Sequence, residues 1–120
     1  MKTLVLGLTG SIGMGKTVAT EIFRRSGIPV FAADEVVHRL LSPTGEAALL
    51  VGKFFPQAVR NNTVDRKVLG NKVFRNPKYL QQLEGILHPL VQKQKARFVC
   101  KAQQRRQAFV VLDIPLLFET

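Results

Sequence analysis

The sequence has little cysteine and no long apolar runs. Cys100 is the single cysteine in 120 residues, so the chain cannot form an internal disulfide. We therefore expect a reduced, cytoplasmic setting, with Cys100 as a small buried side chain on a helix. No apolar run approaches the roughly 18 residues that a membrane span needs. Since no long apolar stretch or small-residue cleavage site follows Lys2, a secretory leader is not expected either.

Acidic residues are also scarce. The chain has 18 lysines and arginines against 8 acids, a net charge of +10, and this excess predicts an anionic partner. Charge alone does not choose among a nucleic acid, a membrane surface and a phosphorylated small molecule. A nucleic acid is not expected, because the eight phenylalanines and one tyrosine lie mostly in apolar patterns and offer no stacking platform. No acid occurs between Glu84 and Asp113, where Lys93, Arg97, Lys101 and Arg105 recur as a basic stripe on a predicted helix.

The order of the remaining patterns predicts an α/β fold. Residues 4–8 are typical of a buried strand, residues 16–27 of a helix that a glycine ends, and residues 28–33 of a second strand. Such a unit indicates a parallel sheet. Helical patterns then continue to about residue 107, and Pro89 is expected to break or kink the last of them. Residues 109–112 return to strand character, which gives three parallel strands with a helical excursion.

A glycine-rich stretch joins the first predicted strand to the first helix. Residues 10–17, GSIGMGKT, match the pattern G-x-x-x-x-G-K-[ST] at every fixed position. Glycines let backbone N–H groups approach phosphate oxygens, and the following helix adds its free N-terminal donors. Lys16 can reach the outer phosphates of a nucleotide, and Thr17 can offer its hydroxyl to Mg²⁺. A plain strand-to-helix turn is the alternative, but the flanking strand and helix favour a phosphate-binding P-loop.

Two acids end predicted strands. Ligands of parallel α/β sheets bind beyond the carboxyl ends of the strands, so Asp34 and Asp113 are both expected near the glycine loop. A helix N-cap or a turn is the structural alternative for each. Glu119 follows Asp113 closely and is a further candidate. The basic stripe suits an anionic partner, although a solvated helix face would look the same.

Five segments, in this order, resemble the dephospho-CoA kinase family: GLTGSIGMGKT, PVFAADEVVHRLL, VDRKVLGNKVF, LEGILHPLV and VVLDIPLLFE. The P-loop is shared with many families, whereas the segment around Asp34, LHPLV and above all DIPLLFE are particular to this one. The resemblance implies a three-layer P-loop kinase core with a parallel sheet and a helical acceptor-binding insertion. It also implies phosphoryl transfer from ATP, with Mg²⁺, to the ribose 3′-hydroxyl of dephospho-CoA, the last step of CoA biosynthesis.

The resemblance also implies roles for individual residues. Asp34 and Lys16 would be catalytic, with Asp34 accepting or orienting the proton of the 3′-hydroxyl. The ATP phosphates would be held by Gly10, Ser11, Ile12, Gly13, Met14, Gly15, Lys16 and Thr17, and Thr17 would also contact Mg²⁺. The acceptor would be held by Asp34, Arg66, His88, Asp113, Pro115, Leu116 and Glu119. From the pattern alone, Arg66 could equally lie on the surface, and His88 could make a structural hydrogen bond.

In this resemblance, residues 1–40 are the first part of the nucleotide-binding core, residues 41–108 the CoA-binding insertion, and residues 109–120 a third core strand and substrate loop. Family members continue further, so the lid with its arginines and the last strands of the sheet are expected to be absent. Loss of a neighbouring strand would leave residues 4–8 as an open apolar edge. We therefore expect either a homo-oligomer through that edge or a piece of a longer protein. The alternatives are a truncated module that binds ATP or CoA without turnover, and another P-loop kinase acting on a nucleotide or nucleoside.

Overall fold

The computed structural model describes residues 2–8, 14–61 and 63–114, and for residues 14–17 it describes the backbone alone. The chain forms two compact units, one of Met1–Val36 with Lys93–Thr120 and the other of Val37–Gln92. The two boundaries fall inside helices α2 (Ala33–Leu40) and α5 (Pro77–Gln104), so each of these helices contributes residues to both units.

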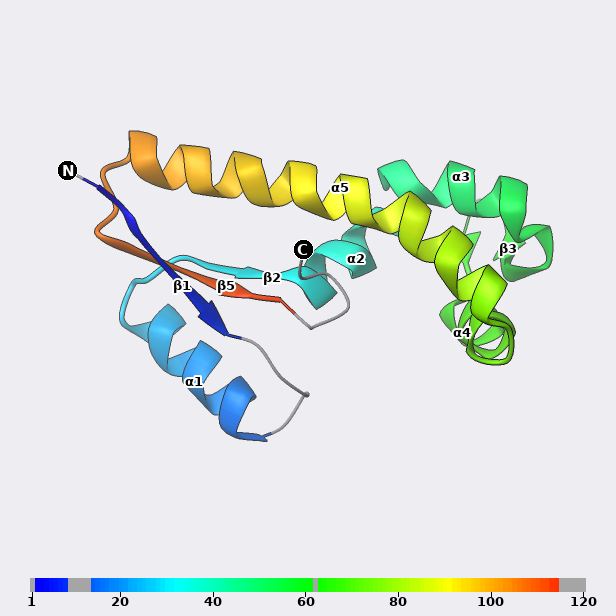
Figure 1. The fold of residues 1–120 in the computed structure, drawn as a ribbon, viewed down its shortest axis with the longest axis horizontal. Helices are drawn as coiled ribbons and strands as arrows, with labels where there is room; N and C mark the ends of the chain where they lie inside the picture. The colour runs from blue at the N-terminus through cyan, green and yellow to red at the C-terminus, as the bar shows by residue number, and fades with distance from the viewer. Residues whose placement is uncertain (1, 9–13, 62, 115–120) are drawn as a thin grey trace. The chain divides into compact units, whose positions relative to one another are not determined.

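The first unit is built on a parallel three-stranded sheet with the order β1-β5-β2 (Figure 1). Its strands are β1 (Leu4–Leu8), β2 (Val30–Ala32) and β5 (Phe109–Asp113), so the three predicted strands are confirmed. β5 comes last in the sequence but lies in the middle, and its register places Leu8 and Ala32 on either side of Asp113. The carboxyl ends of all three strands therefore meet at one edge of the sheet.

Helices cover both faces of this sheet. α1 (Met14–Arg25) lies on one side, and the carboxyl half of α5 lies on the other (Figure 1). Phe98 of α5 packs against Phe31 of β2 with their ring centroids 5.5 Å apart. Val110 and Val111 of the central strand are fully buried. The first unit is thus the three-layer α/β core that the sequence predicts.

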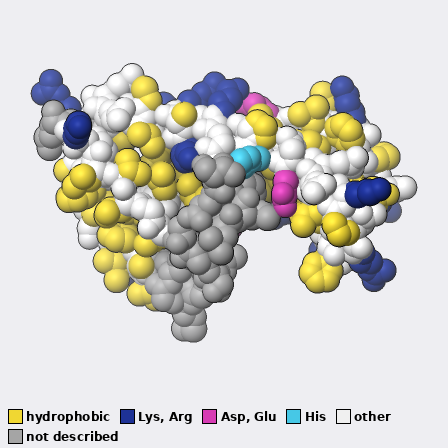
Figure 2. All heavy atoms as spheres, viewed as in Figure 1, with side chains coloured by type: hydrophobic (Ala, Val, Ile, Leu, Met, Phe, Trp, Pro, Cys, Tyr) yellow, Lys and Arg dark blue, Asp and Glu magenta, His cyan; other side chains and the backbone are white. Residues whose placement is uncertain are grey.

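The β1 side of the first unit exposes apolar side chains. Within the described residues β1 has a neighbouring strand on one side only, and Leu4, Val5 and Leu6 are 57%, 45% and 41% exposed. Val18 and Ile22, on the apolar side of α1, are also more than half exposed. Figure 2 shows hydrophobic side chains gathered on this part of the surface. The described structure therefore leaves one apolar face of the core uncovered.

The second unit is mainly helical. Along the chain its further elements are α3 (Glu46–Phe54), a 3-10 turn (Pro56–Ala58), β3 (Val59–Arg60), β4 (Thr63–Val64) and α4 (Arg66–Phe74). The antiparallel β3–β4 hairpin is a correction to the sequence analysis, which expects helical patterns and no strand between the second and third strands of the sheet. Asn61, at the tip, has a φ of 52°, a conformation that asparagine tolerates better than most residues.

The core of the second unit forms around Phe55. This side chain and those of Ala47, Val51 and Ala58 are fully buried. The Phe55 ring meets the Tyr79 ring of α5 edge-on, with the centroids 5.8 Å apart. The first half of α5 is thereby tied to α3 and the turn after it.

Side chains cap two helices of this unit. The Asp65 carboxylate accepts hydrogen bonds from the backbone N–H groups of Lys67 and Val68 at the start of α4. The Asn76 side chain accepts one from the N–H of Lys78, and Pro77 follows as the first residue of α5. Both helices therefore begin where a capping residue satisfies free donors.

Two expectations for α5 are wrong, a break of the helix at Pro89 and a buried Cys100. The helix runs unbroken through Pro89, because Leu87 and Val91 are buried on either side of the proline. Pro89 and Gly85 are themselves exposed, so the Gly85 carbonyl that loses its helical donor lies where water can reach it. Cys100 is exposed and not buried. Among the helices that the structure describes, none combines the length and the hydrophobicity needed to cross a bilayer.

Candidate functional site

The candidate site lies where the carboxyl ends of the three strands meet. β1 ends at Leu8, and the P-loop sequence follows it before α1 begins at Met14. Asp113 is the last residue of β5, in register with both Leu8 and Ala32. Asp34 comes two residues after Ala32. The start of the P-loop and both predicted carboxylates thus belong to one edge of the sheet, which is where parallel α/β sheets bind ligands.

The P-loop residues Gly10, Ser11, Ile12 and Gly13 lie outside the described residues. The other four, Met14, Gly15, Lys16 and Thr17, form the first turn of α1, which therefore begins inside the motif. Backbone N–H groups in the first turn of a helix have no partner within it and attract anions. The first turn of α1 contains no acid, so no carboxylate of the helix itself competes for these donors.

Asp34 lies in the first turn of α2 and is exposed. β2 ends at Ala32 and α2 begins at Ala33, so the helix starts one residue earlier than the strand pattern predicts. The neighbouring Glu35 binds Arg24 of α1, with its two carboxylate oxygens 2.7 and 2.9 Å from Arg24 Nη2. This ion pair ties the start of α2 to the end of α1 and leaves the Asp34 carboxylate open to solvent.

Asp113 has a different environment from Asp34. Its side chain is half-buried, and its Oδ1 atom is shielded from solvent. The sheet edge therefore offers one carboxylate that a ligand can approach freely and one that is fixed in the middle of the edge. An exposed carboxylate can reach the hydroxyl of an incoming ligand, which is the geometric requirement for a general base.

In the second unit the structure brings Arg66 together with His38. Arg66 is the first residue of α4, and its Nη1 atom lies 2.5 Å from Nδ1 of His38 in α2. Both side chains are exposed. The sequence analysis missed His38. The signal that could have found it is its spacing of four residues from Asp34 within one helix.

Of the remaining predicted acceptor residues, the structure describes His88 alone. His88 is half-buried in α5, and its Nε2 atom lies 3.4 Å from Nε2 of Gln92, one turn further along. Pro115, Leu116 and Glu119 lie outside the described residues. The roles of all four residues stay predictions.

The basic stripe is exposed along the carboxyl half of α5. α5 ends at Gln104, and the turn that follows brings the Ala108 carbonyl to the Leu4 N–H, 2.8 Å away at the start of β1. The Arg105 end of the stripe therefore lies at the amino-terminal edge of the sheet, opposite Asp113. The whole stripe cannot serve a single site at the carboxyl edge.

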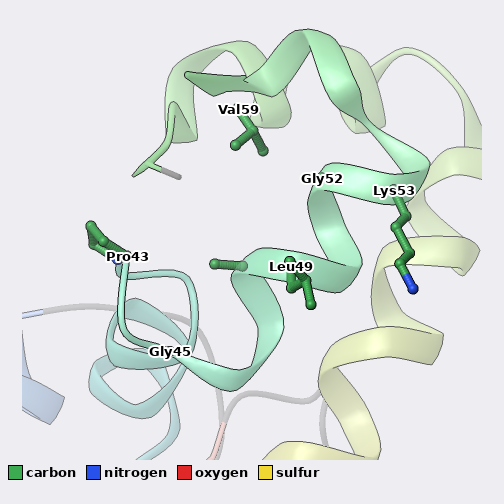
Figure 3. Close-up of a pocket in the computed structure, with 7 residues that line it drawn as sticks. Pro43, Gly45, Leu49, Gly52, Lys53 and Val59 are labelled. Atoms are coloured by element: carbon green, nitrogen blue, oxygen red, sulfur yellow. The ribbon is translucent and has the colours of Figure 1, made fainter. Parts of the chain in front are cut away.

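The second unit also contains a hollow of about 410 Å³ (Figure 3). Its lining residues are Pro43, Gly45, Ala48, Leu49, Gly52, Lys53 and Val59. Lys53 is the charged member of this set, and its amine points away from Val59 (Figure 3). Among the predicted site residues that the structure describes, none is part of this lining.

No cluster of three or more His, Cys, Asp or Glu side chains within residues 2–8, 14–61 and 63–114 is placed to hold a metal ion. Thr17, the predicted Mg²⁺ ligand, is described by its backbone alone.

Comparisons with known proteins agree on one family. A family model described as dephospho-CoA kinase matches residues 4–120. A dephospho-CoA kinase of Paramagnetospirillum magneticum is 49% identical over 116 residues, which cover 97% of this chain and 55% of that protein. One of Brucella melitensis is 47% identical over 117 residues, covering 98% of this chain and 58% of that protein. This chain thus spans little more than half the length of these curated relatives.

Two solved structures superpose on most of this chain. A dephospho-CoA kinase from Campylobacter jejuni superposes with a TM-score of 0.78 at 30% identity, covering 96% of this chain and 58% of that one. A Thermus thermophilus protein superposes with a TM-score of 0.77 at 32% identity, covering 98% and 59%.

Proposed function

Because the chain belongs to the dephospho-CoA kinase family, we propose that it takes part in phosphoryl transfer from ATP to the ribose 3′-hydroxyl of dephospho-CoA, giving CoA. The observation that supports this most directly is that β1, which leads into the P-loop sequence, ends at the same edge of the sheet as Asp113, with Asp34 just beyond the end of β2. That edge combines donors for phosphate with a carboxylate open to an incoming hydroxyl. Since the chain spans 55% and 58% of the two curated relatives, the proposal concerns the part of the enzyme that it represents.

In the proposed step, the 3′-oxygen of the acceptor forms a bond to the γ-phosphorus of ATP. The bond from that phosphorus to the β–γ bridging oxygen breaks, and ADP leaves with the electron pair. The proton of the hydroxyl passes to the Asp34 carboxylate. Such transfers have a loose transition state, so the main task of the protein is to position both substrates and to neutralise charge.

The P-loop would supply that neutralisation. Backbone N–H groups of Gly10–Thr17 and the Lys16 ammonium would hold the β- and γ-phosphates, as the motif implies. Mg²⁺ would enter with ATP as part of the co-substrate, with the Thr17 hydroxyl among its ligands. The start of α1 within the motif supports this reading, because its first-turn donors would face the same phosphates.

The acceptor would be held by Asp34, Asp113, Pro115, Leu116 and Glu119 from the sheet side, and by Arg66 and His88 from the helical segment over residues 41–108. Arg66 has the strongest support, because it is exposed and carries a charge that suits a phosphate. A cytoplasmic setting, expected from the single cysteine, is compatible with a reaction that consumes ATP.

The test is ADP release measured in a coupled assay with dephospho-CoA present or absent. Release that depends on dephospho-CoA supports the kinase. Release that depends instead on another nucleoside or nucleotide in a substrate panel would indicate a different P-loop kinase. Retained ATP binding without any turnover would indicate a binding module, and absence of ATP binding would refute the proposal.

We also propose that the chain self-associates through β1. This strand is an edge of the described sheet, and its exposed leucine and valine side chains form an apolar strip. An open apolar edge offers unpaired backbone groups to a second strand. Light scattering at several concentrations tests this proposal, and a monomer throughout would refute it.

A further inference from the structure

The pairing of His38 with Arg66 determines the state of the imidazole. Arg66 can donate hydrogen bonds but cannot accept them, since a guanidinium stays protonated in proteins. His38 Nδ1, 2.5 Å from Arg66 Nη1, must therefore be the acceptor. An imidazole that accepts at Nδ1 is neutral and carries its proton on Nε2. The pair thus presents the Nε2–H of His38 and the remaining N–H groups of Arg66, all of which are donors.

The positive charge of Arg66 is not cancelled by this contact. Its partner is a neutral ring, and no ion pair with a carboxylate is found for Arg66 among the residues that the structure describes. The adjacent Asp65 carboxylate caps α4 through the N–H groups of Lys67 and Val68. A guanidinium held in one orientation, with its charge intact and its donors exposed, is suited to bind phosphate.

We propose that His38 is a positioning residue for the acceptor. Its ring holds the Arg66 guanidinium, and the two side chains together bind a phosphate group of the nucleotide-like acceptor. This inference rests on the proposed function for the identity of the acceptor. The anion-binding pair itself rests on the His38–Arg66 geometry alone.

Isothermal calorimetry with dephospho-CoA tests the role of each ring nitrogen. His38→Ala and His38→Gln should bind dephospho-CoA roughly tenfold or more weakly, because the acceptor for Arg66 is lost. His38→Asn should keep most of the affinity, since its Oδ1 lies near the place of Nδ1 and can accept from Arg66. ATP affinity should stay unchanged in all three variants. Parent-like binding by His38→Ala, or no rescue by His38→Asn, would overturn the proposal.

Charge-matched variants separate positioning from general electrostatics. Arg66→Gln and Lys67→Gln each remove one exposed positive charge from the first turn of α4. Arg66→Gln should lose binding as His38→Ala does, and Lys67→Gln should change it less than about twofold. Equal losses in the two variants would show that the net charge matters and the pair does not.

Nitrogen-resolved NMR of the histidine rings distinguishes anion binding by the pair from a purely structural role, because a purely structural histidine would not respond to an added anion. The chain has two histidines, so the ring signal that is absent from His38→Ala is assigned to His38 in the parent protein. His38 should show the Nε2–H tautomer, lose that preference in Arg66→Gln, and shift when inorganic pyrophosphate is added. A shift with pyrophosphate but none with dephospho-CoA would support the pair and refute the proposed acceptor. No shift with either anion would overturn the pair.

Discussion

Gly45 lies in the turn between α2 and α3, and replacing it should destabilise the second unit strongly. A Cβ atom built on Gly45 would collide with the backbone carbonyl oxygens of Arg39 and Leu40 at the end of α2. These are main-chain atoms, and the Arg39 carbonyl also accepts a hydrogen bond of 2.7 Å from the Ser42 hydroxyl. No rotamer change can relieve the overlap. The Gly45 φ of −79° suits any residue, so the effect of Gly45→Ala isolates the lack of space.

The expected loss in the free energy of unfolding follows from the kind of steric overlap. Overpacking typically costs about 1–3 kcal/mol, and a clash with fixed backbone belongs at the upper end of that range. Gly52→Ala is the matched control. Gly52 lies inside α3, and a Cβ atom added there would lie at an ordinary van der Waals distance of 3.6 Å from the Val59 side chain. Alanine is favoured over glycine in a helix by about 1 kcal/mol, so this control should be more stable than the parent. The two variants should therefore differ by about 4 kcal/mol in the free energy of unfolding.

Urea unfolding measures this difference, and the chain supplies its own probe. Tyr79 is the only tyrosine, there is no tryptophan, and Tyr79 packs against Phe55 in the core of the second unit. Tyrosine fluorescence therefore reports on this unit, and circular dichroism reports on the helices as a whole. A Gly45→Ala variant within about 0.5 kcal/mol of the parent would refute the reasoning. So would a Gly52→Ala variant that is less stable than Gly45→Ala.

Four further outcomes are expected. Lys16→Ala should abolish phosphoryl transfer in the coupled assay, because the ammonium that clamps the outer phosphates is lost; transfer at the parent rate would refute its role. Asp34→Asn should lower turnover by roughly 10²-fold or more with ATP affinity retained in calorimetry, whereas the neighbouring Glu35→Gln should keep near-parent turnover. Val5→Lys should reduce any self-association seen by light scattering, because a charge on an edge strand opposes pairing, and an unchanged particle mass would exclude β1 as the interface. Asp65→Ala should cost about 1 kcal/mol in urea unfolding through loss of the α4 cap, and no change would show that this cap contributes nothing.

Most of the architecture could be predicted from the sequence because the relevant signals are local. The glycine motif, the apolar run before it and the helical pattern after it place β1 and α1, and Asp65 and Asn76 mark helix starts by their capping chemistry. The break expected at Pro89 is wrong because the cost of a proline depends on the rest of the helix. Burial of Leu87 and Val91 outweighs one lost hydrogen bond on an exposed face.

The candidate site could be predicted only where a local sequence pattern is specific to one kind of chemistry. The P-loop pattern predicts phosphate binding, and the position of Asp113 at the end of a strand predicts its place at the edge of the sheet. The link from His38 to Arg66 joins residues 28 positions apart, and no local pattern predicts which partner a surface arginine finds. The β3–β4 hairpin was missed because two-residue strands are too short for an alternating pattern to be visible.

The central place of β5 has a consequence for how the chain is made. β1 and β2 each pair with β5, so neither can join this sheet until the residues up to Asp113 have left the ribosome. The segment Val37–Gln92 is continuous and can pack earlier from its own neighbours. At about 5–20 residues per second, synthesis leaves the first strand waiting for several seconds. During that interval the apolar side chains of β1 lack the strand with which they pair in the finished sheet, so the nascent chain exposes them to solvent.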